Sequence, residues 1–559
     1  MSELPYIAPI EEQRFLLEHV SGLSELAADP RFAEATPELA DAILEGAGDF
    51  ASGVFAPLNA AGDHEGAQWT PDGVRMPAGY AEAYRAYVEG GWGALAVPVE
   101  YGGQGLPRSL ATAVMENLHA ANMAFNLITM LTEGGVEALI AHGSKAQQER
   151  WLPYLITGEY NATMNLTEPQ AGSDVGAVRA TATPRDDGMY AISGQKIFIT
   201  FGEHDLTENV LHLVLARTPG SPAGTRGISM FLVPRFRDDG TSNNVRCLSI
   251  EKKMGIHASP TCVMSFGEGG ECLGELVGAE NGGMRNMFTM MNNARTSVGL
   301  EGIGVAERAT QAALAYADMR FQFGVPIARQ PDVQRMLLRM QALTQGSRAL
   351  AYYAAGLFDR VTLGDEAAKH RLALLVPLVK SRGSDVGIEV ANLGIQVHGG
   401  LGFIEETGVA QYLRDARIAA IYEGTNGIQA ADLVSRKLPL EDGAVLASLL
   451  ADIRSDEVPA TLASLVDDIE EVCRAFAAAT PEERLFGSAP LLTMLATAVE
   501  GWLMHRLARA ATGPSDFEAG KRRVAAFHLA ALVPEASGLK AGALMMNLSN
   551  FNELRGTCE

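Results

Sequence analysis

One acidic residue, Glu423, interrupts an apolar stretch of the chain and is followed at once by a glycine-bounded turn. Ile418, Ile421 and Tyr422 precede it, so we expect its carboxyl to lie beside buried surface. Desolvation there raises a carboxyl pKa toward the range useful to a general base. Gly424 allows the backbone to approach a ligand closely. The same pattern fits an ordinary acid near the start of a helix, so this segment alone leaves the role of Glu423 open.

The residues after this turn have the spacing that begins a helix. Asn426 and Gln429 lie three positions apart, which is typical of a capping box with Asn426 as the N-cap. The free N–H groups of such a helix start could face an anion or an oxyanion. We therefore expect residues 424–429 to border a ligand site.

Two further segments have side chains that suit a flat, polar ligand. Residues 164–176 end a predicted strand in a polar, turn-rich loop that contains Thr167 and Ser173. Residues 194–200 alternate as a strand does, which places Phe198 and Thr200 on one face. An aromatic ring beside a hydroxyl could pack against a ring and hydrogen-bond it. Each segment also fits a surface turn or a half-buried strand, so neither alone settles the function.

The elements that must position these segments follow the order helix, sheet, helix. Helical spacing runs from about residue 35 to 160, and short β-like runs occupy 209–216, 227–233 and 261–266, with a hairpin signal at Asp187-Gly188. Helical periodicity returns in 295–321, 332–358, 365–393 and 428–437, and again beyond Pro439. We predict a mainly helical α+β protein with four parts, at 1–160, 161–283, 284–438 and 439–559. Strands do not alternate with helices, which argues against a doubly wound nucleotide-binding sheet.

Composition excludes several classes of protein. The formal charge of −23 and the lack of a dense basic tract argue against nucleic acid as a partner. Five cysteines without a CxxC pair indicate a reducing compartment, taken as the cytoplasm, and no structural metal site. The N-terminus lacks the pattern of a secretory signal. The longest apolar stretch, near 491–504, is interrupted by Glu500, so we expect a buried helix there and no transmembrane segment.

Taken together, these segments resemble the acyl-CoA dehydrogenase family of flavoproteins. The similarity covers about residues 40–437 in family order, and the chain beyond Pro439 resembles a longer bacterial subgroup with a helical C-terminal extension. That subgroup includes enzymes acting on 3-methylthiopropionyl-CoA and enzymes acting on fatty acyl-CoA. The matching segments are 101–105, 167–174, 198–200, 253–259, Arg295, 320–324, 396–403 and 422–425. The resemblance implies an acyl-CoA dehydrogenase-like fold, with an N-terminal helical domain, a middle β-barrel-like domain, a C-terminal helical bundle and the extra helical extension.

The resemblance also implies the ligands and the residues that contact them. FAD is expected between the β domain and the following helical domain, with its adenine end reached from a neighbouring subunit, so a homodimer or homotetramer is expected. The residues assigned to FAD by this resemblance are Leu166, Thr167, Phe198, Thr200, Arg320, Gln322, Phe323, Gln396, Gly399, Gly400, Thr425 and Asn426. Those assigned to the acyl-CoA substrate or the wall of its site are Ser173, Asn292, Arg295 and Gly424.

Two of the candidate residues also have simpler interpretations. Arg295 could form a salt bridge on a helix surface, although its place in the family motif assigns it to the substrate. His398, between Val397 and Gly399, is expected to serve packing or a backbone hydrogen bond rather than acid–base chemistry. Phe198 stands where many members of the family have tryptophan, which keeps the packing surface and removes an indole donor.

The reaction implied is α,β-dehydrogenation of an acyl-CoA thioester to the trans-2-enoyl-CoA. Glu423 would remove the α-proton while the β-hydride passes to N5 of the flavin. The backbone N–H of Glu423 and a flavin hydroxyl would hold the thioester oxygen, and an electron-transfer flavoprotein would accept the electrons. Two alternatives stay open: an acyl-CoA oxidase of the same fold, and a non-catalytic protein that binds acyl-CoA or flavin. The sequence does not choose the acyl group.

Overall fold

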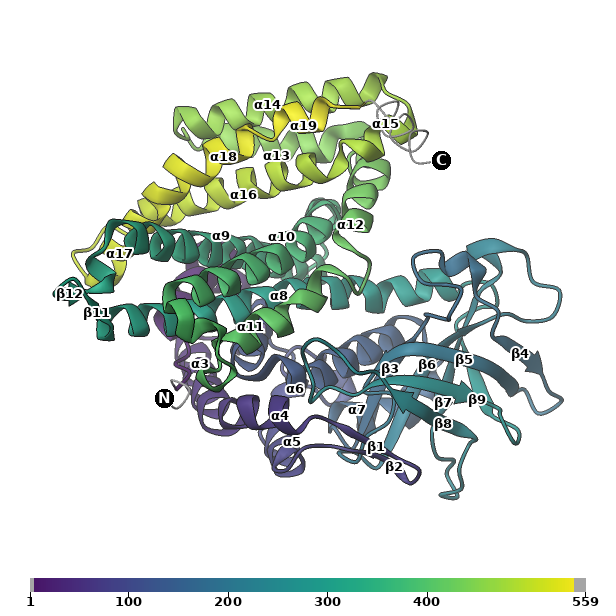
Figure 1. Cartoon of the computed structure of the whole chain (residues 1–559). Coiled ribbons are helices and arrows are strands. Elements are labelled where there is room, and N and C mark those ends of the chain that lie inside the picture. Colours follow the sequence, from purple (N-terminus) through teal and green to yellow (C-terminus); the bar gives the residue numbers. More distant parts are fainter. Residues whose placement is uncertain (1–4, 547–559) are drawn as a thin grey trace, which may run out of the picture.

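The structure is a computed structural model that describes residues 5–546 (Figure 1). A group of helices at the N-terminal end packs beside a β-sheet, a bundle of long helices follows, and a further layer of helices covers that bundle. This arrangement confirms the predicted mainly helical α+β fold and its helix, sheet, helix order. Cys558 and the last part of the extension lie outside the described residues.

The N-terminal helices surround one long helix, α6 (Arg108–His142), which bends at Asn122. By length and composition α6 could cross a membrane, but 83% of its most apolar window is buried inside the protein, as in the core helix of a folded domain. The longest apolar stretch was predicted elsewhere, at 491–504. The other elements of this part are α1 (Ile10–Leu16), α2 (Leu23–Leu26), α3 (Pro37–Phe50), α4 (Asn59–Glu65), β1 (Gln68–Thr70), β2 (Gly73–Arg75), α5 (Tyr80–Glu89) and α7 (Lys145–Ile156).

The middle part of the chain forms an eight-stranded sheet. Its strands are β3 (Tyr160–Asn165), β4 (Thr181–Pro184), β5 (Tyr190–Thr200), β6 (Asn209–Ala216), β7 (Ser229–Pro234), β8 (Val245–Ile250), β9 (Thr261–Phe266) and β10 (Leu273–Val277). They are ordered β3-β6-β7-β10-β5-β9-β8, with β4 beside β5. Among these strands β3 and β6 pair in parallel, and the other ladders are antiparallel. The three predicted strands correspond to β6, β7 and β9, and Asp187-Gly188 lies in the turn of the β4–β5 hairpin, where Gly188 has a φ of 82°.

The helical bundle is built on three long helices, α8 (Gly283–Met319), α9 (Pro331–Thr362) and α10 (Glu366–His398). The helix predicted from residue 295 begins at 283 instead, because its first turns pack on the sheet, where the Gly283 N–H donates to Ile228 O at 2.8 Å. Helices α8 and α10 approach so closely that a Cβ on Gly302 would lie 2.0 Å from the Gly383 carbonyl oxygen. The hairpin of β11 (Phe321–Gln322) and β12 (Val325–Pro326), α11 (Val409–Ala416) and α12 (Asn426–Asp432) complete this part.

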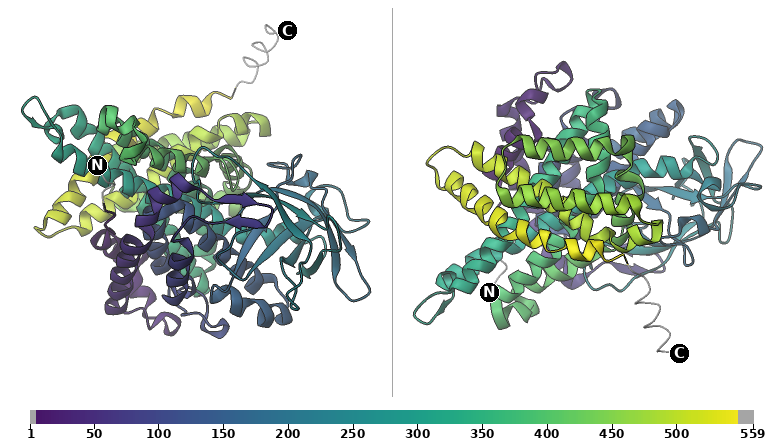
Figure 2. Two further views of the ribbon diagram at one scale, coloured as in Figure 1. Left: turned by 60° about the horizontal axis from the view of Figure 1, so that its bottom comes forward. Right: turned by 90° about the horizontal axis from the view of Figure 1, so that it is seen from above.

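The extension lies over the bundle as a separate layer of helices (Figure 2). The apolar stretch 491–504 is part of α16 and is buried, as predicted. Glu500 in this stretch is fully buried, and it accepts hydrogen bonds from Arg382 of α10, at 3.1 Å to each oxygen, and from Ser347 of α9 at 2.7 Å. The helices of the extension are α13 (Ala444–Ser455), α14 (Ala460–Ala478), α15 (Pro481–Phe486), α16 (Ser488–Ala510), α17 (Asp516–Phe527), α18 (Val533–Ser537) and α19 (Lys540–Leu544). The hydrogen bonds of Glu500 with α9 and α10 join the extension to the bundle.

Candidate active site

Glu423 lies in a short loop between a turn of 3-10 helix and the start of α12. Its backbone has a φ of 53°, and that of Gly424 has a φ of 82°. A left-handed backbone is unusual for a residue with a side chain, and such positions gather at functional sites where the surrounding structure holds them. The side chain of Gln429 supplies part of that support, since it donates to the carbonyl oxygens of Glu423 at 3.2 Å and Gly424 at 3.1 Å.

The cap of α12 differs from the predicted one. The N-cap is Thr425, whose hydroxyl accepts a hydrogen bond from the N–H of Ile428 at 3.2 Å. The predicted capping box, with Asn426 as the cap, is therefore wrong by one residue, because the side chain of Gln429 turns back to the loop carbonyls instead. Asn426 is the first residue of the helix, and its amide contacts α10. The predicted contact of Thr425 and Asn426 with FAD stays a prediction.

The electrostatic surroundings of Glu423 suit a base. Burial raises the pKa of Glu423 to about 7, against the opposing effect of the cations of Arg295 and Lys380. None of residues 5–546 donates a hydrogen bond to its carboxyl oxygens, so both oxygens are available to a ligand. A carboxyl with a pKa near neutrality is well matched to removing a proton from carbon at physiological pH.

Arg295 lies beside this base in the interior. It is 3% exposed and forms an ion pair with Asp432 of α12, with 3.1 Å between Nη1 and Oδ2. The alternative of a salt bridge on a helix surface is therefore wrong, since both partners are buried. Ser173 and Asn292, by contrast, are exposed. The assignment of these three residues and of Gly424 to the substrate stays a prediction.

A second group of candidate residues gathers at the end of β3 and in β5. The Thr167 carbonyl oxygen accepts a hydrogen bond from the N–H of Ile197 at 2.9 Å, and the Lys196 ammonium donates to the Leu166 carbonyl oxygen at 3.0 Å. These bonds hold the 166–167 loop against β5, where the ladder to β9 is irregular between Lys196 and Ile199. Phe198 lies in this bulge with a φ of 60°. Bulges of this kind redirect a side chain next to functional sites.

Glu168 clamps the same loop from inside the protein. Its buried carboxylate pairs with Lys196 at 2.8 Å and accepts hydrogen bonds from the N–H groups of Arg179 at 2.7 Å and Ala180 at 3.0 Å. Burial alone would raise the pKa of Glu168, but these partners hold it below its usual range. These contacts fix the position of the loop relative to β5.

The exposed side of this group fits a flat, polar ring. Phe198 is 58% exposed, so one face of its ring is open to contact with a ligand. The hydroxyls of Thr167 and Thr200 form no hydrogen bond with any of residues 5–546, so they are free to bind a ligand. An exposed aromatic face and two free hydroxyls match what an isoalloxazine ring needs. Among the described residues no three His, Cys, Asp or Glu side chains come together as metal ligands.

The residues assigned to the adenine end lie elsewhere. Arg320, Gln322, Phe323, Gln396, Gly399 and Gly400 are all exposed. The β11–β12 hairpin, which carries Gln322 and Phe323, projects from the end of the bundle away from the sheet (Figure 1). One copy of the chain thus does not bring the two groups of FAD candidates together. His398, close by, stacks on Tyr316 with ring centres 4.3 Å apart, and its Nδ1 contacts the Gly394 carbonyl oxygen at 2.7 Å, which confirms its packing role.

Two charged residues near Glu423 were missed by the sequence analysis. Glu301 on α8 and Lys380 on α10 are both fully buried. The available signal was a charged residue among small and apolar neighbours, as at 299–303. Such a signal has many ordinary explanations, and only the packing of α8 on α10 shows that both residues face the loop of the base.

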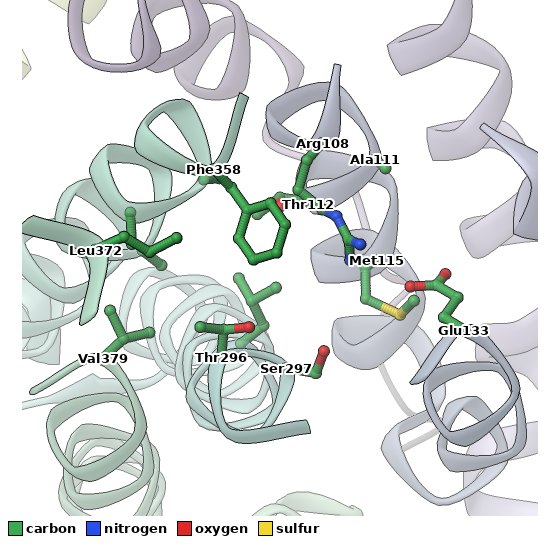
Figure 3. A pocket seen from close by; sticks show the side chains of 14 residues that line it. Arg108, Ala111, Thr112, Met115, Glu133, Thr296, Ser297, Phe358, Leu372 and Val379 are labelled. Carbon is green, nitrogen blue, oxygen red and sulfur yellow. The ribbon is translucent and has the colours of Figure 1, made fainter. Parts of the chain in front are cut away.

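A small cavity lies among the long helices α6, α8, α9 and α10 (Figure 3). Its volume is about 40 Å³, room for a few water molecules. Arg108 and Glu133 of α6 and Thr296 and Ser297 of α8 point toward it (Figure 3). Burial raises the pKa of Glu133 to about 7, with Arg108 acting against the rise. Glu423 does not line this cavity, which is too small for an acyl chain with its thioester.

Comparison with known families accounts for nearly the whole chain. Residues 37–159, 163–268 and 281–438 match the N-terminal, middle and C-terminal domains of acyl-CoA dehydrogenases. Residues 444–549 match the domain described as acetyl-CoA dehydrogenase C-terminal like.

Individual proteins and structures agree with this assignment. A 3-methylmercaptopropionyl-CoA dehydrogenase of Ruegeria pomeroyi is 45% identical over 542 residues, which cover 91% of this chain and 92% of that protein. The broad-specificity linear acyl-CoA dehydrogenase FadE5 of Mycobacterium tuberculosis is 32% identical over an alignment that covers 95% of this chain and 96% of that protein. Caenorhabditis elegans ACDH-11 in complex with C11-CoA superposes with a TM-score of 0.81 at 19% identity, covering 94% of this chain and 92% of that one. An acyl-CoA dehydrogenase of Bacillus anthracis complexed with FAD superposes with a TM-score of 0.76 at 24% identity, covering 90% of this chain and 87% of that one.

Proposed function

The chain belongs to the acyl-CoA dehydrogenase family of FAD-dependent oxidoreductases, and on that premise we propose that Glu423 is the base that removes the α-proton of an acyl-CoA thioester. The product is then the trans-2-enoyl-CoA. The observation that carries this proposal is the state of Glu423, a half-buried carboxyl with a pKa raised to about 7 and no hydrogen-bond partner among the described residues.

The residues of the chain perform defined parts of this reaction. The Glu423 carboxylate takes the α-proton, and its raised pKa brings the proton affinity of the base closer to that of the weakly acidic carbon. The N–H of Glu423 donates to no acceptor among the described residues, so it is free to bind the thioester oxygen, where negative charge develops. FAD, when bound, supplies the acceptor for the hydride that leaves the β-carbon. Thr167, Phe198 and Thr200 bind and orient its ring.

The assembly follows from the second group of FAD candidates. We infer a homodimer or homotetramer in which Arg320, Gln322 and Gln396 reach the adenine end of the FAD held by a neighbouring copy. Supporting this, Phe323 is 93% exposed and Phe403 is 85% exposed near these residues, and exposed apolar side chains that gather in one place mark contact sites for another protein. If the protein is diluted below the dissociation constant of the assembly, the copies should separate. Each copy should then lose FAD, because the adenine end loses its contacts with the neighbouring copy.

The acyl group, the electron acceptor and the compartment are also part of the proposal. The relative at 45% identity is named for 3-methylmercaptopropionyl-CoA, which makes this thioester the first to test, beside linear acyl-CoA thioesters of increasing length. An electron-transfer flavoprotein is the proposed acceptor. The cysteines among the described residues are unpaired, which fits the cytoplasm as the compartment.

The test compares Glu423→Gln with a matched control. Glu457 is an exposed glutamate that also has a left-handed backbone, with a φ of 52°, so Glu457→Gln makes the same chemical change away from the site. Glu423→Gln is expected to keep its yellow FAD while losing α-proton exchange and dye reduction, and Glu457→Gln is expected to retain both. Normal turnover by Glu423→Gln would remove the base from the proposal. Rapid reoxidation by oxygen in place of dye would indicate an oxidase.

A further inference from the structure

The residue directly before the base is tied to a buried acid. The Tyr422 hydroxyl donates a hydrogen bond to Oε2 of Glu301 on α8. Glu301 is 0% exposed, and its other oxygen, Oε1, has no partner among the described residues. Burying a carboxyl with only one oxygen hydrogen-bonded lowers the stability of the fold. A smaller polar side chain could accept the same hydrogen bond from the tyrosine hydroxyl with less loss of stability. The position therefore needs an explanation beyond packing.

The residues after the base are tied to α10 in the same way. Lys380 is fully buried, and its ammonium donates to Oδ1 of Asn426 at 2.9 Å. The Asn426 amide donates in turn to the Ser384 hydroxyl at 3.0 Å and to Asp385 at 2.7 Å. The loop that carries Glu423 is thus held at Tyr422 by one helix and at Asn426 by another.

The crossing of these two helices brings both anchors together. Gly302, next to Glu301, meets the backbone of Gly383, and Gly387 would place a Cβ 2.6 Å from the Gly302 Cα. A larger side chain at either glycine would meet the backbone of the other helix, so α8 and α10 are held in close contact beside Glu301 and Lys380. Each of them affects the pKa of the other, and Glu423 affects the pKa of both.

We propose that Glu301 is a positioning residue for the reaction, because its carboxyl holds the Tyr422 hydroxyl and so fixes the backbone from which Glu423 projects. Through Lys380 it also helps to set the charge beneath the base. This inference rests on the proposed function of Glu423. Glu301 does not touch the reacting atoms and acts through Tyr422 and Lys380.

The charges around Glu301 give the inference a pH signature. Tyr422 and Glu423 face it from the loop and Lys380 from α10, while Asp385 and Arg295 act on Lys380. Burial lowers the pKa of Lys380 to about 8, and the acids around it, Glu301 among them, oppose that fall. Burial raises the pKa of Glu301 itself to about 8, so Glu301 acts on Lys380 as an anion only in alkaline solution. Replacing Glu301 by glutamine removes that anion, so Lys380 should lose its proton at lower pH there. Where activity falls at alkaline pH through loss of the Lys380 cation, that fall should move to lower pH in Glu301→Gln.

The experiment measures the rate at which saturating acyl-CoA bleaches the flavin of the purified holoenzyme without oxygen. Tyr422→Phe removes the hydroxyl bond and is expected to slow bleaching about tenfold, the effect of misplacing a base by one modest interaction. Glu301→Leu should cause a similar loss, and the double variant should be no slower than either single one, because both remove the same bond. Glu301→Gln keeps an acceptor for the hydroxyl, so it should recover part of the rate.

A matched control comes from the core. Tyr352 donates a hydrogen bond to Glu116 at 2.8 Å, and both residues are fully buried away from the loop. Tyr352→Phe therefore removes the same kind of bond and is expected to lower stability while leaving the bleaching rate and its alkaline limb in place. A purely structural role for Glu301 predicts this result for Tyr422→Phe as well.

The outcomes separate this inference from the proposal on which it rests. If Glu423→Gln is inactive while Tyr422→Phe and Glu301→Gln bleach at the normal rate with the normal pH profile, the positioning role is wrong and the base stands. If Glu423→Gln turns over normally, the base assignment itself fails. Should Glu301→Leu not fold, Tyr422→Phe and Glu301→Gln still decide the question.

Discussion

The enzyme should lose activity as the pH falls below about 7, because the base, Glu423, becomes protonated. Burial raises the pKa of Glu423 to about 7 from the value near 4.5 of an exposed glutamate. At pH 6 only about one base in ten is then ionised, and at pH 5 about one in a hundred. The bleaching rate at low substrate concentration should therefore fall roughly tenfold for each unit below pH 7. An exposed glutamate would keep nearly its full rate at pH 6.

Lys380 provides the perturbation that tests the cause. Its buried cation lowers the pKa of Glu423, so Lys380→Met, which keeps the length of the side chain, should raise that pKa and move the acid limb to higher pH. Lys521→Met is the matched control, because Lys521 is also buried and paired, with Glu12 at 2.6 Å, but lies between α17 and the N-terminal helices. In Lys521→Met the fall of the bleaching rate at acid pH should occur at the same pH as in the unchanged protein.

Stopped-flow bleaching without oxygen, recorded at low substrate concentration between pH 5 and 8, is the assay. Under that condition the rate reports the ionisation of the free enzyme rather than that of the complex. The reasoning is refuted by a rate that is flat down to pH 5, and equally by an acid limb that moves to lower pH in Lys380→Met. The first outcome would mean that Glu423 is ionised throughout, and the second that the Lys380 cation does not lower the pKa of Glu423, as an acid limb that stays in place would also show.

Three other predictions concern stability and FAD binding. Gly302→Ala should destabilise the protein by about 1–3 kcal/mol, since its Cβ would meet backbone atoms, whereas Gly520→Ala, with nothing within 4 Å, should not; thermal unfolding compares the two. Lys196→Met leaves the buried carboxylate of Glu168 without its cation and should weaken FAD binding by roughly tenfold, measured from flavin fluorescence released on dilution. Glu500→Ala leaves the guanidinium of Arg382 on α10, whose side chain is 11% exposed, without its carboxylate partner, and should lower the free energy of unfolding by about 3–5 kcal/mol. An unchanged midpoint of denaturant unfolding would contradict this.

The local elements of the fold could be predicted because they are written in short-range patterns. The strands β6, β7 and β9 and the turn at Asp187-Gly188 follow from alternation and turn chemistry within a few residues. Errors arose at the ends of elements. The early start of α8 depends on a hydrogen bond to Ile228, and the cap at Thr425 depends on where the Gln429 side chain goes, neither of which is a property of the local sequence.

The sequence by itself determined the order of helix and sheet, the family motifs and the choice of Glu423 as the candidate base, since residue type and spacing carry all three. The tertiary structure decided what surrounds that base. Glu301 and Lys380 are far from Glu423 along the chain and come beneath it only because glycines let α8 and α10 cross closely. A pKa depends on burial and on charges within a few ångströms, and those neighbours are assembled by packing between distant segments.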